Sequence, residues 1–439
     1  MNIRLEELAN RAIEVLKSNW RDGFTIPTDK LYPFQWNWDS GFVSLGHGHH
    51  NLDWAIVELE RLFSGQWENG MIPHILFHNE NIDTYFPNHD FWMPEVNSGS
   101  PKNVRTSGIT QPPVHGFILE YLFKRNPNNN KLKDFIRAIY SKVVKSHDFF
   151  YTYRDPKSEG LAFIYHPWET GRDNSPLWDE SMDRIVVDYT TLPKYERKDL
   201  NHADNKQRPT QEHYDKYVYL LELGKKFKYD EQGIAENSPL LIQDSMLNAI
   251  LIRSNESLIN LGKALNLDTG KVEEWQQQSK RTFNEKLWSN KLNFYTCYDM
   301  VAEKQIDTIE IGGLVTLFAN LPDKNQAASL KEYLEDLHSK GYNLCPSFDV
   351  DHELFDSQRY WRGPVWPQMD WMIYHGLKQY GFYDLASILK DDFIGLVSKL
   401  GFYEYFESEK NKANQLDKGY GGNNFSWTAS SILDLIKAS

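Results

Sequence analysis

Cysteine and long apolar runs are nearly absent from this sequence, and each absence excludes a class of protein. The 439 residues include two cysteines, Cys297 and Cys345, too few for a framework of several disulfide bonds. Neither lies in a CxxC or nucleophile-like setting, so both are expected to be buried thiols. No stretch reaches the roughly 18 apolar residues of a membrane span, and residues 1–7 are charged rather than apolar like a signal peptide. We therefore expect a soluble, cytoplasmic protein with no membrane partner.

Positive charge is also scarce. The chain carries 48 Lys and Arg against 61 Asp and Glu, a formal net charge of −13, and no basic cluster is interleaved with aromatic residues. Nucleic acid is therefore not an expected partner. Aromatic residues are abundant instead, at 14% with 14 Trp. Because many stand beside Gly, Pro, Asp and Asn, part of this set is expected to line a cleft and the rest to form the core.

Apolar residues recur at three- and four-residue spacing along most of the chain, which predicts a mainly helical protein. The expected helices are residues 5–20, 54–63, 114–123, 132–151, 214–226, 240–265, 272–288, 312–318, 327–337, 364–380, 383–400 and 426–436. About a dozen helices in antiparallel succession, joined by connections with turn residues, favour a toroid of helical hairpins over a βαβ fold. We expect one domain over residues 1–439.

Local signals mark helix starts and loops. Ser175-Pro176 and Gly363-Pro364 each place proline at a first helical position behind a residue that can cap. Residues 69–112 are irregular and rich in Gly, Pro and Asn, which predicts a functional lid or rim around a cleft. Residues 193–205 are polar and are also expected to form a loop.

Two acidic residues stand among glycine and aromatic residues in segments far apart in the chain. Asp173 lies in WETGRDNSP, residues 168–176, and Glu404 lies in GFYEYF, residues 401–406. Hydrolysis of a glycosidic bond needs one carboxylic acid for the leaving oxygen and a second carboxylate on the other face, and aromatic planes suit sugar rings. The pattern predicts a glycosidase. The ordinary alternative for an acidic residue is a solvated surface charge, which is the role expected for Glu409.

These motifs together resemble glycoside hydrolase family 63. YPFQWNWDSG (residues 32–41), QPP (111–113), the Asp173 run, YWRGPVW (360–366) and the Glu404 segment occur in the order seen in that family. The closest likeness is to short bacterial members that hydrolyse mannosylglycerate and glucosylglycerate, through RPTQEHYD at residues 208–215. Trehalases and processing α-glucosidases share part of the pattern.

The resemblance implies an all-α (α/α)6 barrel and an inverting α-glycosidase without cofactor or metal. Asp173 matches the general acid, and Glu404 matches the general base that activates water. Inversion requires the two carboxyl groups to lie roughly 6.5–9.5 Å apart, with room for that water. The implied substrate is a small α-glycoside, mannosylglycerate or glucosylglycerate.

Residues that contact the substrate are expected from the same motifs. The set is Tyr32, Trp38, Asp39, Gln111, Trp168, Arg172, Arg208, Tyr214, Tyr360, Trp361, Gly363, Trp366 and Trp427. By resemblance, the sugar whose bond is cleaved is surrounded by Asp39, Gln111, Trp361, Gly363 and Trp366. For Trp38 and Trp427, packing in the core is an equal alternative. Arg208 suits the glycerate carboxylate because its fork pairs bidentately; its alternative is a structural salt bridge.

The surroundings of Asp173 pull its pKa in opposite directions. A helix start two residues on favours the charged form, whereas a general acid must hold its proton near neutral pH. Desolvation by Trp168 and Trp178 is expected to raise the pKa of Asp173. Arg172 would lower that pKa unless its guanidinium is turned toward another partner.

Three other hypotheses remain open at this stage. A trehalase-like or α-glucosidase activity on a neutral disaccharide is the first, and a non-catalytic sugar-binding paralogue is the second. The third is a metal site at GHGHH, residues 46–50, where His47 and His50 share a helical face, but no HExxH motif occurs and satisfied loop histidines are the default expectation. The sequence leaves the oligomeric state open.

Overall fold

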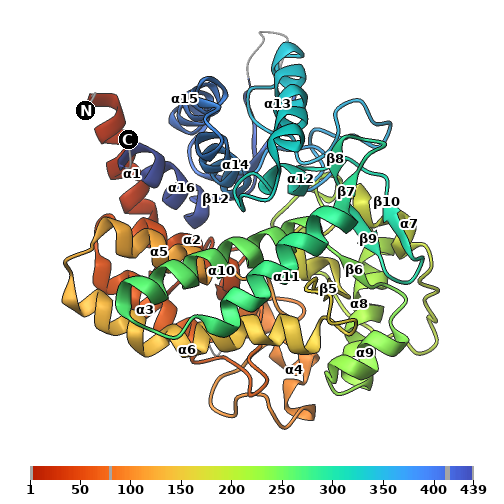
Figure 1. Cartoon of the computed structure of the whole chain (residues 1–439). Helices are drawn as coiled ribbons and strands as arrows, with labels where there is room; N and C mark the ends of the chain where they lie inside the picture. Colours follow the sequence, from red (N-terminus) through yellow and green to blue (C-terminus); the bar gives the residue numbers. More distant parts are fainter. Residues whose placement is uncertain (1–2, 79–81, 411–415, 438–439) are drawn as a thin grey trace.

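The computed structural model describes residues 3–78, 82–410 and 416–437 and is rich in helices (Figure 1). The helices are α1 (Ile3–Asn19), α2 (Asn37–His47), α3 (Leu52–Phe63), α4 (His89–Trp92), α5 (His115–Arg125), α6 (Asn130–Tyr153), α7 (Asp179–Met182), α8 (Gln211–Lys226), α9 (Glu231–Asn237), α10 (Ser245–Leu265), α11 (Gly270–Leu287), α12 (Ile311–Val315), α13 (Lys324–Ser339), α14 (Pro367–Gln379), α15 (Tyr383–Leu400) and α16 (Ser426–Lys437). The expectation of a mainly helical chain is confirmed.

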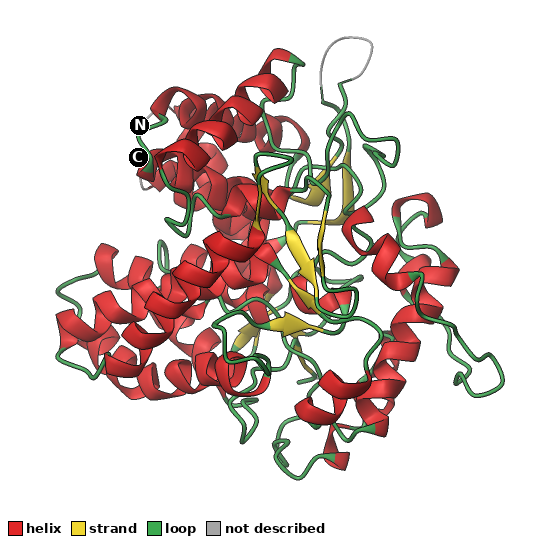
Figure 2. Ribbon diagram, turned by 45° about the vertical axis from the view of Figure 1, so that its right-hand side comes forward, coloured by secondary structure: helices red, strands yellow, loops and turns green. Residues whose placement is uncertain are grey.

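Short strands connect the helices. They are β1 (Trp20–Arg21), β2 (Phe24–Thr25), β3 (Gln35–Trp36), β4 (Ile75–Leu76), β5 (Phe163–Ile164), β6 (Ile242–Gln243), β7 (Trp288–Ser289), β8 (Phe294–Tyr295), β9 (Cys297–Asp299), β10 (Lys304–Ile306), β11 (Tyr403–Phe406) and β12 (Gly419–Asn423). The pairs are antiparallel, and β10, β9, β6 and β5 form a four-stranded sheet in that order. Figure 2 shows the strands lying among the loops beside the helices rather than as a separate layer.

Six of the described helices pack in a closed ring. α2 contacts α5, α5 contacts α10, α10 contacts α12, α12 contacts α14, α14 contacts α16, and α16 returns to α2. Every residue of α2 and α12 is buried, as is α16 from Ser426 to Ile436. A helix that is apolar or small on all sides belongs in an interior, which explains why these segments lie at the centre.

Amphipathic helices lie outside this ring. α1 packs on α2 and α16, α3 on α2, α6 on α5 and α10, α11 on α10, and α15 on α14 and α16. A helix outside the ring precedes each ring helix along the chain: α1, α3, α6, α11, α13 and α15 come before α2, α5, α10, α12, α14 and α16. α13 buries only Ala327, Leu330, Leu334 and Leu337, at helical spacing. The chain therefore alternates between the outside and the ring.

Most predicted helices are confirmed, and the errors have local causes. Residues 240–265 begin as a helix only at Ser245, because Ile242–Gln243 form β6. Residues 364–380 become helical at Pro367 rather than Pro364, because Val365 exchanges backbone hydrogen bonds with Phe406. α2 was not predicted: buried on all sides, it carries no polar face to reveal a helical period.

Candidate active site

A deep cavity of about 730 Å³, mouth included, lies among the connections that lead into the ring helices. Its lining residues are Pro27, Leu31, Tyr32, Trp36, Trp38, Asp39, His74, Tyr85, Phe86, Gln111, Trp168, Gly171, Asp173, Asp199, Arg208, Pro209, Tyr214, Tyr360, Glu404, Phe425 and Trp427. They come from the α1–α2, α3–α5, α6–α10, α13–α14 and α15–α16 connections and the first turns of α2, α8 and α16. The alternation of outer and ring helices thus brings segments from the whole chain to one place.

Glu404 lies on β11. Its side chain is 1% exposed. Its Oε1 accepts hydrogen bonds from the hydroxyls of Tyr32 (3.0 Å) and Tyr360 (3.2 Å), and its Oε2 accepts one from the backbone N–H of Gly422 (3.3 Å). Burial raises the pKa of Glu404, and the nearby Arg208 and the hydrogen bonds oppose that rise. A buried carboxylate with a raised pKa is suited to accept a proton.

Gly421 leaves the space that the Glu404 side chain occupies, and a methyl group there is predicted to displace Glu404. The φ angle of Gly421 is +69°, and a Cβ would lie 2.0 Å from Oε2 and 2.7 Å from Cβ of Glu404. We expect Gly421→Ala to lower kcat by about 10²-fold, because misplacing a reacting group by about 1 Å has that effect. Steady-state kinetics measures it.

Gly381→Ala is the matched control for this substitution. Gly381 also has a positive φ, +78°, but nothing lies within 4 Å of its Cβ position. Both variants carry a backbone strain of about 1 kcal/mol, and Gly421→Ala adds the collision with Glu404, so the thermal stability of Gly381→Ala reports the strain alone. Only Gly421→Ala should lose activity; equal kinetics in the two variants would contradict the assigned position of Glu404.

Asp173 follows a tight turn and precedes a short helical turn. Gly171, at φ +71°, ends residues 167–170, and the predicted cap is confirmed because Ser175 Oγ accepts from Leu177 N at 3.4 Å. The Tyr217 hydroxyl donates to the backbone carbonyl of Asp173 at 2.5 Å. Burial raises the pKa of Asp173 to about 7, while Arg208 opposes the rise and Glu404 adds to it. Burial therefore outweighs the charge-favouring surroundings.

Arg172, expected to contact the substrate, is not among the residues that line the cavity. Its guanidinium is buried and pairs with Asp244 and Glu310, and it lies 5.5 Å from the Trp178 ring. The sequence predicted that Arg172 would lower the pKa of Asp173 unless its guanidinium turned toward another partner. Asp244 and Glu310 are such partners, so the charge of Arg172 is directed away from Asp173. Arg172 therefore anchors the segment next to Asp173 to α10 and α12 through the residues that precede them, Asp244 and Glu310.

Three other expected contact residues are also not among those that line the cavity: Trp361, Gly363 and Trp366. Trp361 and Trp366 stack on each other with ring centroids 3.7 Å apart, and Trp366 Nε1 donates to the Tyr360 carbonyl at 3.2 Å. A Cβ on Gly363 would lie 2.6 Å from the carbonyl oxygen of Asp356. These residues form a support behind Tyr360, and Tyr360 itself faces the cavity.

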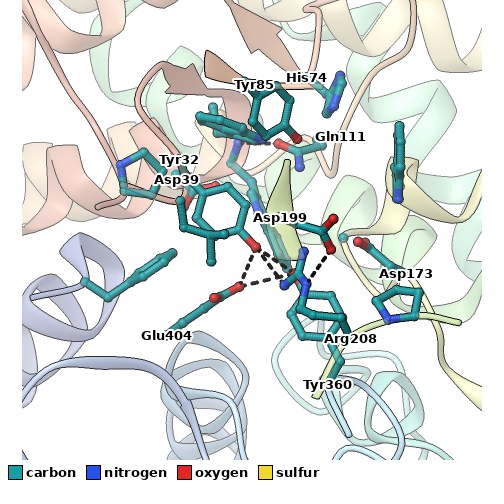
Figure 3. A pocket seen from close by; sticks show the side chains of 18 of the residues that line it. Tyr32, Asp39, His74, Tyr85, Gln111, Asp173, Asp199, Arg208, Tyr360 and Glu404 are labelled. Carbon is teal, nitrogen blue, oxygen red and sulfur yellow. Dashed lines mark hydrogen bonds and ion pairs between the residues drawn. The ribbon is translucent and has the colours of Figure 1, made fainter. Parts of the chain in front are cut away.

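Arg208 lines the cavity between the two carboxyl groups (Figure 3). Its Nε donates to Asp199 at 3.1 Å, its Nη1 donates to the Tyr32 hydroxyl at 3.1 Å, and its guanidinium lies 4.3 Å from the Tyr360 ring centroid. In this view Glu404 and Asp173 lie on opposite sides of the guanidinium. The side chain is held rigidly, which suits recognition of an anionic group.

The other expected contact residues all line the cavity. Trp38 and Trp427, for which core and cavity were both open, line the cavity, as do Trp168 and Tyr214. Asp39 lies in the first turn of α2 and is 4% exposed, and burial raises its pKa. Gln111 lines the cavity and accepts from Trp38 N at 3.3 Å.

Several lining residues were not predicted individually. They are Pro27, Leu31, Trp36, His74, Tyr85, Phe86, Gly171, Asp199, Pro209 and Phe425. His74, Tyr85 and Phe86 lie in the 69–112 segment, and Asp199 lies in the 193–205 loop. Both segments were recognised as loops, but nothing in an irregular sequence indicates which side chain turns inward.

The histidines of residues 46–50 are hydrogen-bonded within the fold. His47 bonds to Thr25 (2.9 Å) and His50 (3.0 Å), and His49 bonds to Asp434 (2.7 Å). In residues 3–78, 82–410 and 416–437, no group of three His, Cys, Asp or Glu is placed to hold a metal ion. Nor does any described helix have the length and hydropathy to cross a membrane.

Two smaller expectations concern single side chains. Cys297 and Cys345 are both free and buried, as the sequence predicted. Glu409, expected to be a surface charge, is exposed. Neither thiol lines the cavity described above.

The pKa values of Asp173 and Glu404 predict a bell-shaped pH profile. Because the pKa of Asp173 is about 7, kcat/KM should fall as pH rises through that value and the proton is lost. Because a general base must be ionised and burial raises the pKa of Glu404, kcat/KM should fall again in acid. The two apparent values belong to the interacting pair. A profile from pH 4 to 9 that stays flat above 7 would contradict the role of Asp173.

Residues 32–428 match the family described as mannosylglycerate hydrolase MGH1-like glycoside hydrolase domain. The mannosylglycerate hydrolase of Thermus thermophilus is 39% identical over 424 residues, which cover 96% of this chain and 99% of the relative. The glucosylglycerate hydrolase of Mycolicibacterium hassiacum is 32% identical over 446 residues, 98% of each chain.

A solved structure has the same fold over nearly the whole chain. It is a family 63 mannosylglycerate hydrolase, also from Thermus thermophilus, in complex with Tris and D-glycerate. The TM-score is 0.91 at 38% sequence identity, covering 98% of this chain and 100% of the other.

Proposed function

Because the chain belongs to the mannosylglycerate hydrolase MGH1-like members of glycoside hydrolase family 63, we propose that it hydrolyses mannosylglycerate to mannose and glycerate. Membership makes the protein a glycoside hydrolase. The observation that carries the proposal is the cavity itself, which holds Asp173, Glu404 and a fixed arginine, Arg208, among aromatic walls. That set of groups suits a sugar joined to a small acid.

In the proposed mechanism, Asp173 is the general acid and Glu404 the general base. Asp173 gives its proton to the glycosidic oxygen as the bond to the anomeric carbon breaks. Glu404 takes a proton from a water whose oxygen attacks that carbon from the opposite face, so the anomeric configuration inverts. The raised pKa values of both groups and their positions on opposite sides of Arg208 support these assignments.

The sugar would lie against the aromatic walls. Trp38, Trp168 and Trp427 offer ring faces for the apolar side of the hexose. Asp39 and Gln111, both lining the cavity, offer groups that bond hydroxyls. Four of the expected contact residues lie outside the lining and would support the residues that do line it. Arg172 would hold the backbone next to Asp173, and Trp361, Gly363 and Trp366 would hold Tyr360 in position.

Arg208 would meet the glycerate carboxylate. Its guanidinium lies in the cavity wall, held by Asp199 on one side and Tyr32 on another. Tyr214 also lines the cavity, and the centroid of its ring lies 4.3 Å from the guanidinium of Arg197. An arginine held in place in this way is suited to bind a carboxylate. Its positive charge would favour a substrate with an acidic aglycone over a neutral disaccharide.

We propose that the ring of helices is an (α/α)6 barrel formed by one domain over residues 1–439. The closed succession of α2, α5, α10, α12, α14 and α16, each preceded by a helix outside the ring, supports this. Residues 69–112 would be the rim, since this segment contributes His74, Tyr85, Phe86 and Gln111 to the cavity.

A comparison of substrates tests the proposal. The enzyme is incubated with mannosylglycerate, glucosylglycerate, trehalose and kojibiose, and kcat/KM is measured from released hexose. Hydrolysis of mannosylglycerate at a higher kcat/KM than either neutral disaccharide is expected. A higher kcat/KM for glucosylglycerate would mean that the substrate contains glucose rather than mannose, as the name of the Mycolicibacterium hassiacum relative indicates for that protein. Preference for trehalose or kojibiose would contradict the role of Arg208.

A further inference from the structure

Two opposite charges line the same cavity on either side of one hydroxyl group. Arg208 Nη1 lies 3.1 Å from the Tyr32 hydroxyl, and that hydroxyl lies 3.0 Å from Glu404 Oε1. Arg208 is 6% and Glu404 1% exposed, so solvent screens the attraction between them weakly. A direct ion pair would cost the enzyme both its anion-binding group and a free base.

The direction of these bonds is fixed by counting protons. A guanidinium has only donors, an ionised carboxylate has only acceptors, and a phenol has one proton. Tyr32 must therefore accept from Arg208 and donate its proton to Glu404. The Tyr360 hydroxyl lies 3.1 Å from that of Tyr32 and 3.2 Å from Glu404 Oε1, so its proton is the second one directed at this network.

Arg208 is restrained on its other side as well. Its Nε bonds to Asp199, which also receives two bonds from Arg197, at 3.1 and 2.8 Å. The Tyr32 ring is itself fixed edge-on against Trp36, 5.2 Å between centroids, and against Phe425, 5.9 Å. The hydroxyl is thus a rigid spacer rather than a flexible contact.

We propose that Tyr32 is a positioning residue whose hydroxyl keeps Arg208 and Glu404 apart, so that one can bind the aglycone anion while the other acts on water. This inference rests on the proposed function and adds to it a reason for Tyr32 beyond contact with substrate. It concerns the free enzyme, and kcat/KM reports the ionisation of the free enzyme.

Tyr32→Phe tests the proposal, with Tyr360→Phe as its matched control. Without the spacer, Arg208 turns to Glu404, and a direct cation lowers the pKa of a carboxylate by about one unit or more. We expect the acid limb of kcat/KM for mannosylglycerate to move to lower pH and KM to rise about tenfold or more. Tyr360→Phe removes a hydroxyl that bonds Glu404 and Tyr32 but leaves the Tyr32 hydroxyl between Arg208 and Glu404, so its acid limb should move to higher pH.

A double variant separates a spacer from a simple donor. Arg208→Met should raise the acid limb more when it is added to Tyr32→Phe, where Arg208 is expected to pair with Glu404 directly, than when it is added to the wild type, where the Tyr32 hydroxyl lies between the two groups. An acid limb of Tyr32→Phe that moves upward, as in the control, or that does not move, would overturn the proposal.

A crystal structure of the Tyr32→Phe enzyme gives the same answer without kinetics. An Arg208 nitrogen within 4 Å of a Glu404 oxygen is expected, and an unchanged Arg208 bound only to Asp199 would refute the inference. The activity of the wild-type enzyme distinguishes failure of the spacer role from failure of the proposed function. If it fails to hydrolyse mannosylglycerate, the proposed function fails; if it succeeds and Arg208 stays in place in the variant, only the spacer role fails.

Discussion

Replacing Asp173 with Asn, or Glu404 with Gln, is expected to lower kcat for mannosylglycerate by about 10²–10⁴-fold, the usual contribution of a general acid or base. Each change keeps the shape of the side chain and removes only its ability to carry a proton. KM should change little, because neither group is proposed to bind substrate chiefly through its charge. Single-turnover hydrolysis measures the loss.

Thermal unfolding provides the control for the first of these variants. The pKa of Asp173 is about 7 in the folded chain and about 4 when unfolded. The folded state therefore binds more protons between these values, and the ionised group lowers stability as pH rises through this window. Asp173→Asn should raise Tm, and more so at pH 8 than at pH 5. Near-normal kcat in a folded variant would show that the roles are wrongly assigned.

Arg208→Met is expected to lower kcat/KM for mannosylglycerate by about 10²–10³-fold, because truncating one partner of a buried charge pair costs 2–5 kcal/mol. Most of the loss should appear in KM. Arg208→Lys should recover part of it, since Lys keeps the charge but loses the planar fork and its stacking on Tyr360.

The matched control for Arg208 is a change of substrate. With mannosylglycerol, which lacks the carboxylate, Arg208→Met should lose less than about tenfold, because only a neutral contact is missing. The fold should tolerate the change, since Asp199 keeps its bonds to Arg197. Equal losses on the charged and the neutral substrate would make Arg208 a structural residue.

Helices with one polar face could be predicted from the sequence, and those without one could not. α15 was predicted at its observed bounds, Tyr383–Leu400, because its apolar residues recur on one side. α2 is equally helical but buried throughout, so no period marks it. The strands were missed because most are two residues long and depend on partners distant in sequence, as Ile242 does on Asp299.

Within the site, the sequence motifs predicted which segments meet at the cavity, but they did not predict which side chains point into it. Tyr360 faces the cavity and its neighbour Trp361 does not, although both belong to one motif. Arg172 pairs with Asp244 and Glu310, which lie 72 and 138 residues away in the chain. No local sequence pattern predicts partners at such distances. Backbone direction and long-range pairing decide these cases.

Proton NMR of mannosylglycerate hydrolysis, followed from the first minutes, tests the central claim most directly. If Asp173 and Glu404 act as acid and base on opposite faces of the sugar, β-mannose appears first, and the α anomer grows only as mutarotation proceeds. Initial release of α-mannose would mean retention through a covalent intermediate and would contradict the roles given to both carboxyl groups.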